Sequence, residues 1–396
     1  MTGVQTCALP ICGFSYAAFG LDEPVGGALI GSGNWVFAWQ GGWALSTGAV
    51  TPALLGFFLY MAAFMDTTAT IPTGSMAERW RWNSFVIWGL FCGAIYYPVT
   101  AAWTWGGGWL ARTWDTMGLG AGYVDFAGSG VVHMVGGVAA YTGARVLGPR
   151  IGKYGPDGSV RAITVHHLPM AMLGTFILLF GWFGFNAAST FAATDVQFAT
   201  VATNTAIAGA FGAVTAMVWI TRRTGKPNPA MMANGMLAGL VAITAPCAFV
   251  APWAAAVIGT VAAVVVIEST YFFEERMRVD DPVGAISVHG VCGALGVLAV
   301  GIFANGSYGA GWNGSGVEGV RGLIDGDLGQ LGAQALGAVS ILVVNGLLSY
   351  GFFRIQHAVT PGGIRSTEAD EIAGLDNAEL GAVAYTEFEL TAHDHG

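Results

Sequence analysis

Charged residues are scarce in this chain. Asp, Glu, Lys and Arg make up only 10% of its 396 residues, while 54% of the residues are hydrophobic. A soluble domain carries about 25% charged residues, so this composition excludes a soluble globular protein. The charges also gather between long apolar runs, and about 20 apolar residues are enough for one helix to cross a bilayer. The composition therefore predicts a polytopic membrane protein.

Patterns typical of metal sites and of catalysis are also missing. The five cysteines form no pair with metal-ligand spacing and indicate no disulfide framework. No nucleophile with a base beside it is visible, so an unrelated membrane enzyme is the least favoured class. The net charge of −9 owes much to an acidic C-terminal tail, and nothing indicates a nucleic-acid partner. We expect no enzyme activity, no metal and no cofactor.

Long apolar runs, by contrast, are abundant. The nine that can span a membrane are 48–66, 83–102, 124–147, 168–190, 198–221, 229–249, 251–273, 284–303 and 331–356. Lys and Arg mark the cytoplasmic side of such spans. When the spans alternate in direction, thirteen of the 15 basic residues fall on one side, and only Arg112 and Arg321 on the other. This asymmetry predicts a multi-pass protein of the cell membrane with a cytoplasmic C-terminus.

Two histidines occupy matching frames in two of these spans. Asp125 lies eight residues before His133, and Asp281 lies eight residues before His289. Each histidine follows a valine and has a glycine four residues after it. An ionisable side chain inside a bilayer is costly and by default marks a function. The two spans are the third and the eighth, so they cross in opposite directions, which predicts an inverted repeat of five helices with a site between its halves.

This repeat also divides the chain. Five spans are expected before residue 148 but only three are visible, so we expect the first half, 13–147, to lack one span and most of a second. Residues 1–12 look like foreign sequence. The second half is expected at 148–305, an outer loop with the last membrane helix at 306–358, and a cytoplasmic tail at 359–396. A chain without the missing helices is not expected to form a working pore.

Three long motifs resemble the ammonium transporter (Amt/Mep/Rh) family, and in particular its prokaryotic Amt type. They read Asp-Phe-Ala-Gly-Ser-Gly-Val-Val-His at 125–133, Gly-Trp-Phe-Gly-Phe-Asn-Ala-Ala-Ser at 181–189, and Val-Asp-Asp-Pro followed by Val-His-Gly-Val-Cys-Gly within 279–293. The resemblance runs from about residue 13 to residue 390. It implies an all-α fold of eleven membrane helices, with two inverted five-helix halves before a final helix, assembled as a homotrimer.

The resemblance implies a site at the outer side that recruits ammonium. Trp105 matches the family's recruitment tryptophan, whose indole face can hold a cation. Ser189 matches a hydroxyl that accepts a hydrogen bond from that cation, and Tyr60 and Trp182 match further aromatic residues of the vestibule. By sequence position alone, each of these aromatic residues would be read as an interfacial or packing residue.

Other residues match the pore itself. Phe64 and Phe185 match a stacked phenyl gate, and His133 and His289 match paired histidines that can bond ammonia and relay a proton. Thr244 matches a threonine close to the pore, although a membrane threonine commonly bonds its own helix backbone. Two histidines alone do not suggest zinc, because zinc takes three or four ligands.

The two aspartates are expected to organise the structure around the site. Asp125 matches the family's inner aspartate, which would order backbone and hydroxyl groups near the recruitment site while its charge favours the cation. Direct ligation is not expected, since a bare carboxylate would hold the cation too tightly for fast release. Asp281 stands in an Asp-Asp-Pro helix start, so we expect it to cap a helix N-terminus.

These expectations describe a transporter or channel that moves ammonium or ammonia through a hydrophobic pore. An ammonium sensor of the same fold is the alternative, because residues 64–70 depart from the commonest sequence of transporters at this place. Residues 364–376 and 381–385 resemble the family's cytoplasmic C-terminal region, which couples subunits and, in many prokaryotic members, binds a P-II signalling protein. Without that resemblance they would be read as a solvated acidic tail.

Overall fold

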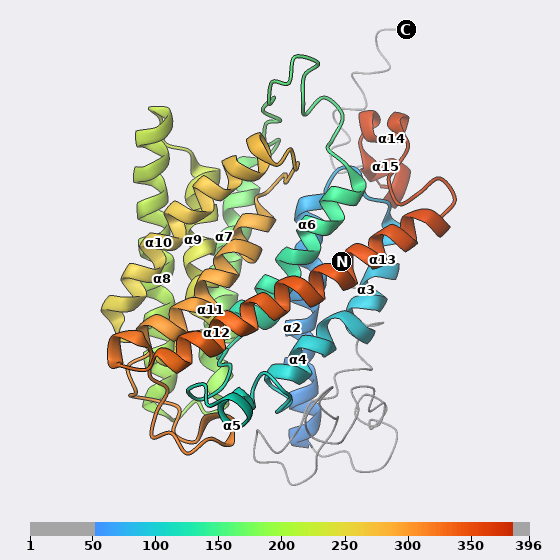
Figure 1. Cartoon of the computed structure of the whole chain (residues 1–396). Coiled ribbons are helices and arrows are strands. Elements are labelled where there is room, and N and C mark those ends of the chain that lie inside the picture. Colours follow the sequence, from blue (N-terminus) through green and yellow to red (C-terminus); the bar gives the residue numbers. More distant parts are fainter. Residues whose placement is uncertain (1–51, 383–396) are drawn as a thin grey trace, which may run out of the picture.

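The computed structural model describes residues 52–382, which fold almost entirely into helices (Figure 1). Six stretches of this part are long and apolar enough to cross a membrane. They are Trp82–Thr104, Leu168–Thr190, Val196–Thr224, Pro252–Arg276, Ile286–Phe303 and Leu328–Val359. The other three expected spans fall on shorter or less apolar helices, and within residues 52–382 there are only isolated β-bridges and no strand. The prediction of an all-helical polytopic fold is confirmed.

Several of the long helices contain a π-helical turn, labelled η. The bounds of all the long helices are α2 Pro52–Met76; α3 Trp82–Phe91, η4 Cys92–Tyr96 and α4 Tyr97–Thr104; η5 Ser129–Met134 and α6 Val135–Leu147; α7 Leu168–Ala187; α8 Val196–Thr224; α9 Pro229–Thr244; α10 Pro252–Tyr271 and η7 Phe272–Arg276; η8 Ile286–Val291 and α11 Cys292–Phe303; and α12 Leu328–Ser340, η11 Ile341–Asn345 and α13 Gly346–Val359. Short helices α5 (Thr113–Met117), α14 (Glu368–Ala373) and α15 (Leu375–Leu380) lie outside these spans. The expected foreign segment 1–12 lies outside the described residues.

Polar side chains fix where several helices begin. The Asn228 side chain accepts hydrogen bonds from the backbone N–H groups of Ala230 (3.0 Å) and Met231 (3.2 Å), and Pro229 follows as the first helical residue of α9. Both choices suit a helix start, where backbone donors lack intrahelical partners. The expected span 124–147 becomes helical only at Ser129, because the residues before it form a buried segment of turns and bends.

The two histidine-bearing helices cross each other where glycines remove their side chains. A Cβ added at Gly137 would overlap the backbone of Gly290, and one added at Gly293 would lie 2.8 Å from the backbone nitrogen of Met134. Gly290 of one helix meets Gly137 of the other, and Gly293, further along the first helix, meets Met134, which comes before Gly137. The two helices therefore run antiparallel. Small residues allow such close backbone approach in membranes. The opposite directions expected of an inverted repeat are therefore present.

The last long helix packs against both halves of the bundle. Its first part, α12, contacts α11, and its last part, α13, contacts α6. In Figure 1 this orange-red helix runs obliquely across the bundle, with α7 to α11 towards one side and α2 to α6 towards the other. The last long helix thus packs against the helices that continue from both histidine-bearing turns, η5 and η8.

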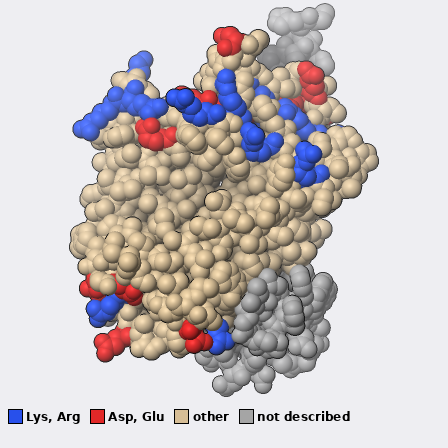
Figure 2. All heavy atoms as spheres, in the orientation of Figure 1, with Lys and Arg blue, Asp and Glu red and all other residues tan. Residues whose placement is uncertain are grey.

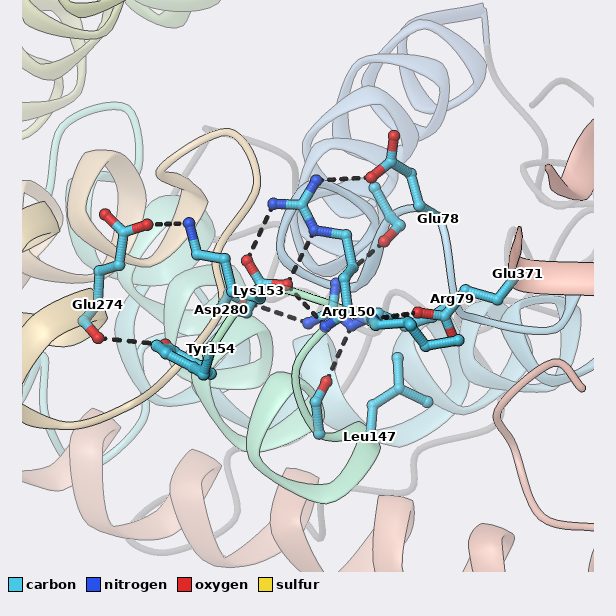
Figure 3. Close-up of polar contacts among 12 residues, drawn as sticks. Glu78, Arg79, Leu147, Arg150, Lys153, Tyr154, Glu274, Asp280 and Glu371 are labelled. Atoms are coloured by element: carbon cyan, nitrogen blue, oxygen red, sulfur yellow. Dashed lines mark hydrogen bonds and ion pairs between the residues drawn. The ribbon is translucent and has the colours of Figure 1, made fainter. Parts of the chain in front are cut away.

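Basic side chains gather mainly at one end of the bundle. Figure 2 shows Lys and Arg concentrated at the end that carries α14 and α15 in Figure 1. Arg150 lies there between Asp280 (2.8 Å) and Glu78 (2.6 Å), as Figure 3 shows, and the buried Arg79 donates to the Asp280 carbonyl oxygen at 2.9 Å. Burial acts to raise the pKa of Asp280, but its hydrogen bonds from Arg150 hold that pKa below its usual range.

The C-terminal segment lies against this charged end. Arg365 pairs with Glu371 at 2.7 Å, and Glu371 also accepts a hydrogen bond from the backbone nitrogen of Ile151 at 2.8 Å. Ile364 is fully buried, and its carbonyl oxygen accepts a hydrogen bond from the backbone nitrogen of Arg81 at 3.1 Å. The first part of the acidic tail is therefore docked on loops of its own chain. The end of the motif at 381–385 lies outside the described residues.

Candidate functional site

An aromatic cavity of about 590 Å³ is lined in part by the end of α4 and by the loop between α11 and α12. In Figure 1 these elements lie at the end of the bundle opposite α14 and α15. The cavity is lined by Tyr60, Met61, Phe64, Thr104, Trp105, Gly107, Tyr123, Asp125, Phe126, Ser189, Phe191, Ala310, Gly311, Trp312, Asn313 and Gly314. Five residues that the sequence singles out, Tyr60, Phe64, Trp105, Asp125 and Ser189, are thus brought together from segments far apart in the chain.

Trp105 is held by its polar edge, which leaves its ring on the cavity wall. It ends α4, and its indole Nε1 donates to the Asp125 carbonyl oxygen at 2.7 Å. The Phe64 ring meets it edge-on, with ring centroids 5.9 Å apart. Because the indole N–H is already bonded, the π face of the ring is the part available to a ligand. An indole face attracts cations through its quadrupole.

Ser189 also lines the cavity, and its hydroxyl takes part in a short chain of hydrogen bonds. Its Oγ donates to the Phe185 carbonyl oxygen at 2.7 Å and lies 2.5 Å from the Tyr60 hydroxyl. Phe191 packs edge-on against the Tyr60 ring at 4.9 Å. Since the Ser189 hydroxyl proton is donated to the Phe185 carbonyl oxygen, the lone pairs of Ser189 Oγ can accept hydrogen bonds from Tyr60 and from a ligand.

Below this cavity two phenyl rings separate it from the histidines. Phe64 and Phe185 stack with centroids 4.0 Å apart and an interplanar angle of 22°. The Phe185 ring also lies 5.4 Å from the His133 ring. The structure therefore brings the two expected gate residues into direct contact, between the cavity and the first histidine.

The two histidines face each other beyond the phenyl rings. Their Nδ1 atoms are 3.1 Å apart, and their rings are nearly parallel at 17° with centroids 5.2 Å apart. His133 is almost fully buried, and its Nε2 has no hydrogen-bond partner among the described residues. A hydrogen bond between two Nδ1 atoms requires a proton on one of them and a free lone pair on the other. One histidine ring of the pair is therefore the donor of this hydrogen bond, and the other ring is its acceptor.

Trp182 lies deeper than a vestibule residue would. Its ring stacks on His133 at 5.1 Å and 14°, and it does not line the cavity. Its Nε1 donates to the Thr244 hydroxyl at 2.9 Å, and Thr244 in turn donates to the Leu240 carbonyl oxygen at 2.7 Å. Thr244 thus bonds its own helix, as membrane threonines commonly do, while it also orients the tryptophan that covers His133.

The two aspartates cap the two histidine-bearing helices in the same way. Asp125 accepts backbone hydrogen bonds from Gly128, Gly130 and Val131 at 2.8–2.9 Å. Asp281 accepts them from the fourth and fifth residues after it, at 3.0 and 2.7 Å. A carboxylate satisfies the unpaired N–H groups of a helix start and opposes its positive dipole end. Asp281 does this near the charged end, and Asp125 beside the cavity.

Two symmetric features of the site are missing from the sequence predictions. Gly128 and Gly284 each stand three residues after an aspartate and have positive φ angles of 113° and 75°. Both histidines also lie in π-helical turns, η5 and η8, which occur often at functional sites. The shared Asp-x-x-Gly spacing is visible in the sequence and would have indicated two matching turns.

Residues of the loop between α11 and α12 were also missed. Trp312 and Asn313, between α11 and α12, line the cavity together with Phe191, Thr104 and Tyr123. No motif marks them, because loop residues reach the cavity only through the fold. Among residues 52–382, no group of three or more His, Cys, Asp or Glu side chains is arranged to hold a metal ion.

Membrane-length helices around an aromatic cavity and a buried histidine pair define a polytopic membrane transport protein. The chain belongs to the ammonium transporter family, whose family model matches residues 4–385. This is a family of transporters and channels rather than of enzymes. The match begins inside residues 1–12, and the foreign origin of that segment stays a prediction.

Two archaeal relatives illustrate the similarity in sequence. Ammonium transporter Amt2 of Archaeoglobus fulgidus is 44% identical over 360 residues, which cover 89% of this chain and 76% of that protein. Ammonium transporter Amt1 of Haloferax mediterranei is 37% identical over 343 residues, which cover 84% of this chain and 63% of that protein.

Solved structures show the same fold. A protein described as "Sensor Amt Protein" superimposes with a TM-score of 0.79 at 34% identity, covering 96% of this chain and 88% of its own. Mep2 of Candida albicans gives a TM-score of 0.74 at 27% identity, covering 93% of this chain and 77% of its own. The helical fold expected from the motifs is therefore confirmed by both.

Proposed function

We propose that this protein carries ammonium or ammonia across the cell membrane through the line of residues that joins the aromatic cavity to the histidine pair. The observation that carries the proposal is the order of these groups. Trp105 and Ser189 line the cavity, the Phe64–Phe185 stack forms its floor, and His133 lies directly behind Phe185. A substrate that moves along this line would meet the recruiting residues first, then the closed phenyl stack, and then the apolar passage beside His133.

Recruitment follows from the chemistry of the cavity wall. Ammonium is a small cation with four N–H donors, so it needs a cation-attracting surface and hydrogen-bond acceptors. The Trp105 indole face supplies the first, and the Ser189 oxygen supplies an acceptor. The buried Asp125 carboxylate already accepts hydrogen bonds from backbone N–H groups, so it adds negative potential to the site without holding the cation directly. Such weak, distributed contacts permit release.

Passage beyond the phenyl rings favours the neutral base. The ring centroids lie 4.0 Å apart, so the rings must move before anything passes between them. A bare cation entering the apolar region beyond would lose its hydration at a cost of several kcal/mol or more, whereas ammonia carries no charge. Proton loss near the stack would therefore ease entry. The linked Nδ1 atoms of His133 and His289 would offer ammonia a donor and an acceptor, and could relay a proton.

Uptake into liposomes tests this function. We expect the full-length protein, purified and reconstituted in liposomes, to accumulate radiolabelled methylammonium in a saturable way that excess ammonium suppresses. Protein-free liposomes are the control for passive leakage of the neutral amine. Uptake no faster than this leak, from protein that is folded by its thermal transition, would contradict the proposal.

An ammonium sensor is the second candidate, because the similar solved structure at 34% identity is described as a sensor. A sensor would bind ammonium at the same cavity and need not move it. Ammonium-dependent quenching of tryptophan fluorescence without any methylammonium uptake would favour the sensor. Binding accompanied by uptake or by ammonium-dependent current would favour the transporter.

We also infer how the protein sits in the membrane and what it meets there. The clustering of Lys and Arg at the tail end (Figure 2) supports a cytoplasmic C-terminus and an outward-facing aromatic cavity. Membership of the family supports a homotrimer, and the loops and docked tail at the charged end offer a surface for a P-II signalling protein. Chemical labelling of a cysteine placed in the 304–327 loop of intact cells tests the orientation, since an outward cavity predicts labelling by a membrane-impermeant reagent.

A further inference from the structure

The segment from residue 121 to residue 127 is buried but not helical. It leads from α5 to the start of η5 and contains Asp125, which holds both Trp105 and the helix of His133. Backbone N–H and C=O groups buried within a membrane protein must find partners inside the protein. The positions of these partners therefore decide where Asp125 lies.

Two fully buried glutamines of α12 supply many of these partners. The Gln330 side chain accepts from the Ala121 nitrogen and donates to the Gly122 oxygen, both at 2.8 Å. The Gln334 side chain accepts from the Val124 nitrogen at 2.8 Å and donates to the oxygen of the same residue at 2.7 Å. Each glutamine amide thus pairs with the segment as a neighbouring β-strand would.

Gln334 reaches both histidine-bearing helices. It bonds the residue directly before Asp125, whose carboxylate caps η5, and its Nε2 also donates to the Val297 carbonyl oxygen of α11 at 2.9 Å. The second donor proton of the same amide therefore connects the segment to the helix of His289. Few side chains can join two elements in this way, and a glutamine amide has the necessary two donors and one acceptor.

The same face of α12 also fits the segment by shape. Gln330, Gln334 and Gly337 follow the spacing i, i+4 and i+7, which places them on one face of a helix. A Cβ at Gly337 would overlap the Tyr123 ring, so the glycine admits that ring. From the loop side, the Asn313 side chain donates to the oxygens of Ala121 (2.9 Å) and Tyr123 (3.0 Å).

We propose that Gln330 and Gln334 are positioning residues of the recruitment site, which set the place of the Trp105 indole through the backbone of residues 121–125. This inference rests on the proposed transport function. The Asp125 carbonyl oxygen is the hydrogen-bond acceptor that orients the indole, and Val124, directly before it, has both of its backbone polar groups bonded to Gln334. The final helix, which lies outside both repeat halves, thereby controls ammonium affinity.

The test compares the Michaelis constant and the maximal rate of methylammonium uptake in liposomes. In Gln334→Met, a side chain of similar length loses every amide bond, so the segment shifts and the indole with it. We expect the KM to rise about three- to ten-fold, a part of what a cation–π contact contributes, while the maximal rate changes less than about two-fold. Gln330→Met, which frees residues further from Asp125, should give a smaller rise in KM.

A matched control lies at the other end of the same long helix. Gln356 of α13 is also buried, and its Nε2 donates to the Ser84 carbonyl oxygen at 2.8 Å, far from the cavity. Gln356→Met should lower thermal stability to a similar extent and leave the KM unchanged. If Gln334→Met does not fold, Gln330→Met decides the question by the same readout.

The outcomes separate this inference from the function on which it rests. A wild-type protein without uptake would refute both. A wild-type protein with uptake, combined with an unchanged KM in both glutamine variants, would overturn the positioning role alone. An equal rise of KM in Gln356→Met would also overturn it, because the effect would then be one of general stability.

Discussion

Single residues at this site present one chemical face to the cavity because their other polar atoms are already bonded. The Trp105 indole N–H donates to the Asp125 carbonyl oxygen, and the Ser189 hydroxyl donates to the Phe185 carbonyl oxygen. What remains exposed to a ligand is an indole π face and an oxygen lone pair, which together suit a small cation with N–H donors.

Replacing Trp105 by leucine should weaken recruitment. The variant keeps an apolar wall but loses the π face, so we expect the KM for methylammonium to rise roughly 2- to 30-fold, as expected for the loss of a cation–π contact of about 0.5–2 kcal/mol. The measurement is concentration-dependent uptake in liposomes. Trp109→Leu is the control, since Trp109 packs against Trp103 at 5.7 Å and does not line the cavity. An equal KM in both variants would contradict a recruiting role for Trp105.

Residues carried by a motif were predictable, while residues brought in by the fold were not. Phe64 and Phe185 were expected to form a stack and do so. Trp182 lies deeper than expected, because it precedes Phe185 by three residues and one helix rises about 4.5 Å over that distance. Asn313 reaches the cavity from a loop more than two hundred residues after Trp105, and no local pattern reveals such a contact.

At the scale of helices, the crossing of η5–α6 with η8–α11 is the element that creates the histidine pair. Matching aspartates, glycines and histidines in the two segments predicted a repeat, and their places as third and eighth spans predicted that they run antiparallel. The π-helical turns around both histidines were not predictable. A uniformly apolar membrane helix has no polar face whose period would reveal an inserted residue.

Gly137→Ala tests this crossing. The added methyl group would overlap the backbone of Gly290, so the two helices must separate. We expect a loss of about 1–3 kcal/mol of stability from overpacking, seen as a lower melting temperature in detergent, together with reduced methylammonium uptake. Gly174→Ala on α7 is the matched control, since nothing lies within 4 Å of its added Cβ. A Gly137→Ala protein as stable and active as the control would show that the crossing tolerates separation.

On the scale of the whole molecule, one end is ionic and tied together, and the other end holds the cavity. The uneven distribution of Lys and Arg was visible in the sequence, and Figure 2 shows the resulting cluster. The docking of the tail was not predictable, because its contacts, such as Glu371 with Ile151, join segments 220 residues apart. Composition alone favoured a solvated tail there.

Asp280→Asn should reveal how far this ionic end stabilises the fold. Asp280 has a lowered pKa in the folded protein, so its carboxylate stabilises the fold above the usual aspartate pKa of about 4 and loses that effect as pH falls through the folded pKa. We expect the variant to melt at a lower temperature at pH 7, with a loss of about 3–5 kcal/mol as for other buried ion pairs broken on one side.

The difference between Asp280→Asn and the wild type should shrink as the pH is lowered towards 3. Glu275→Gln, which neutralises an exposed acidic residue on the neighbouring η7, is the control and should melt like the wild type at every pH. A melting difference for Asp280→Asn that stays constant from pH 7 to pH 3 would refute a stabilising role for the ionised carboxylate.

The route through the histidine pair can be examined by removing both rings at once. In a His133→Ala, His289→Ala double variant, reconstituted at the wild-type density, the cavity residues remain but the Nδ1-linked pair is gone. Methylammonium uptake into liposomes should fall at least about ten-fold, while ammonium still quenches tryptophan fluorescence at the cavity. Uptake at the wild-type rate and KM in the double variant would show that the substrate does not use these histidines.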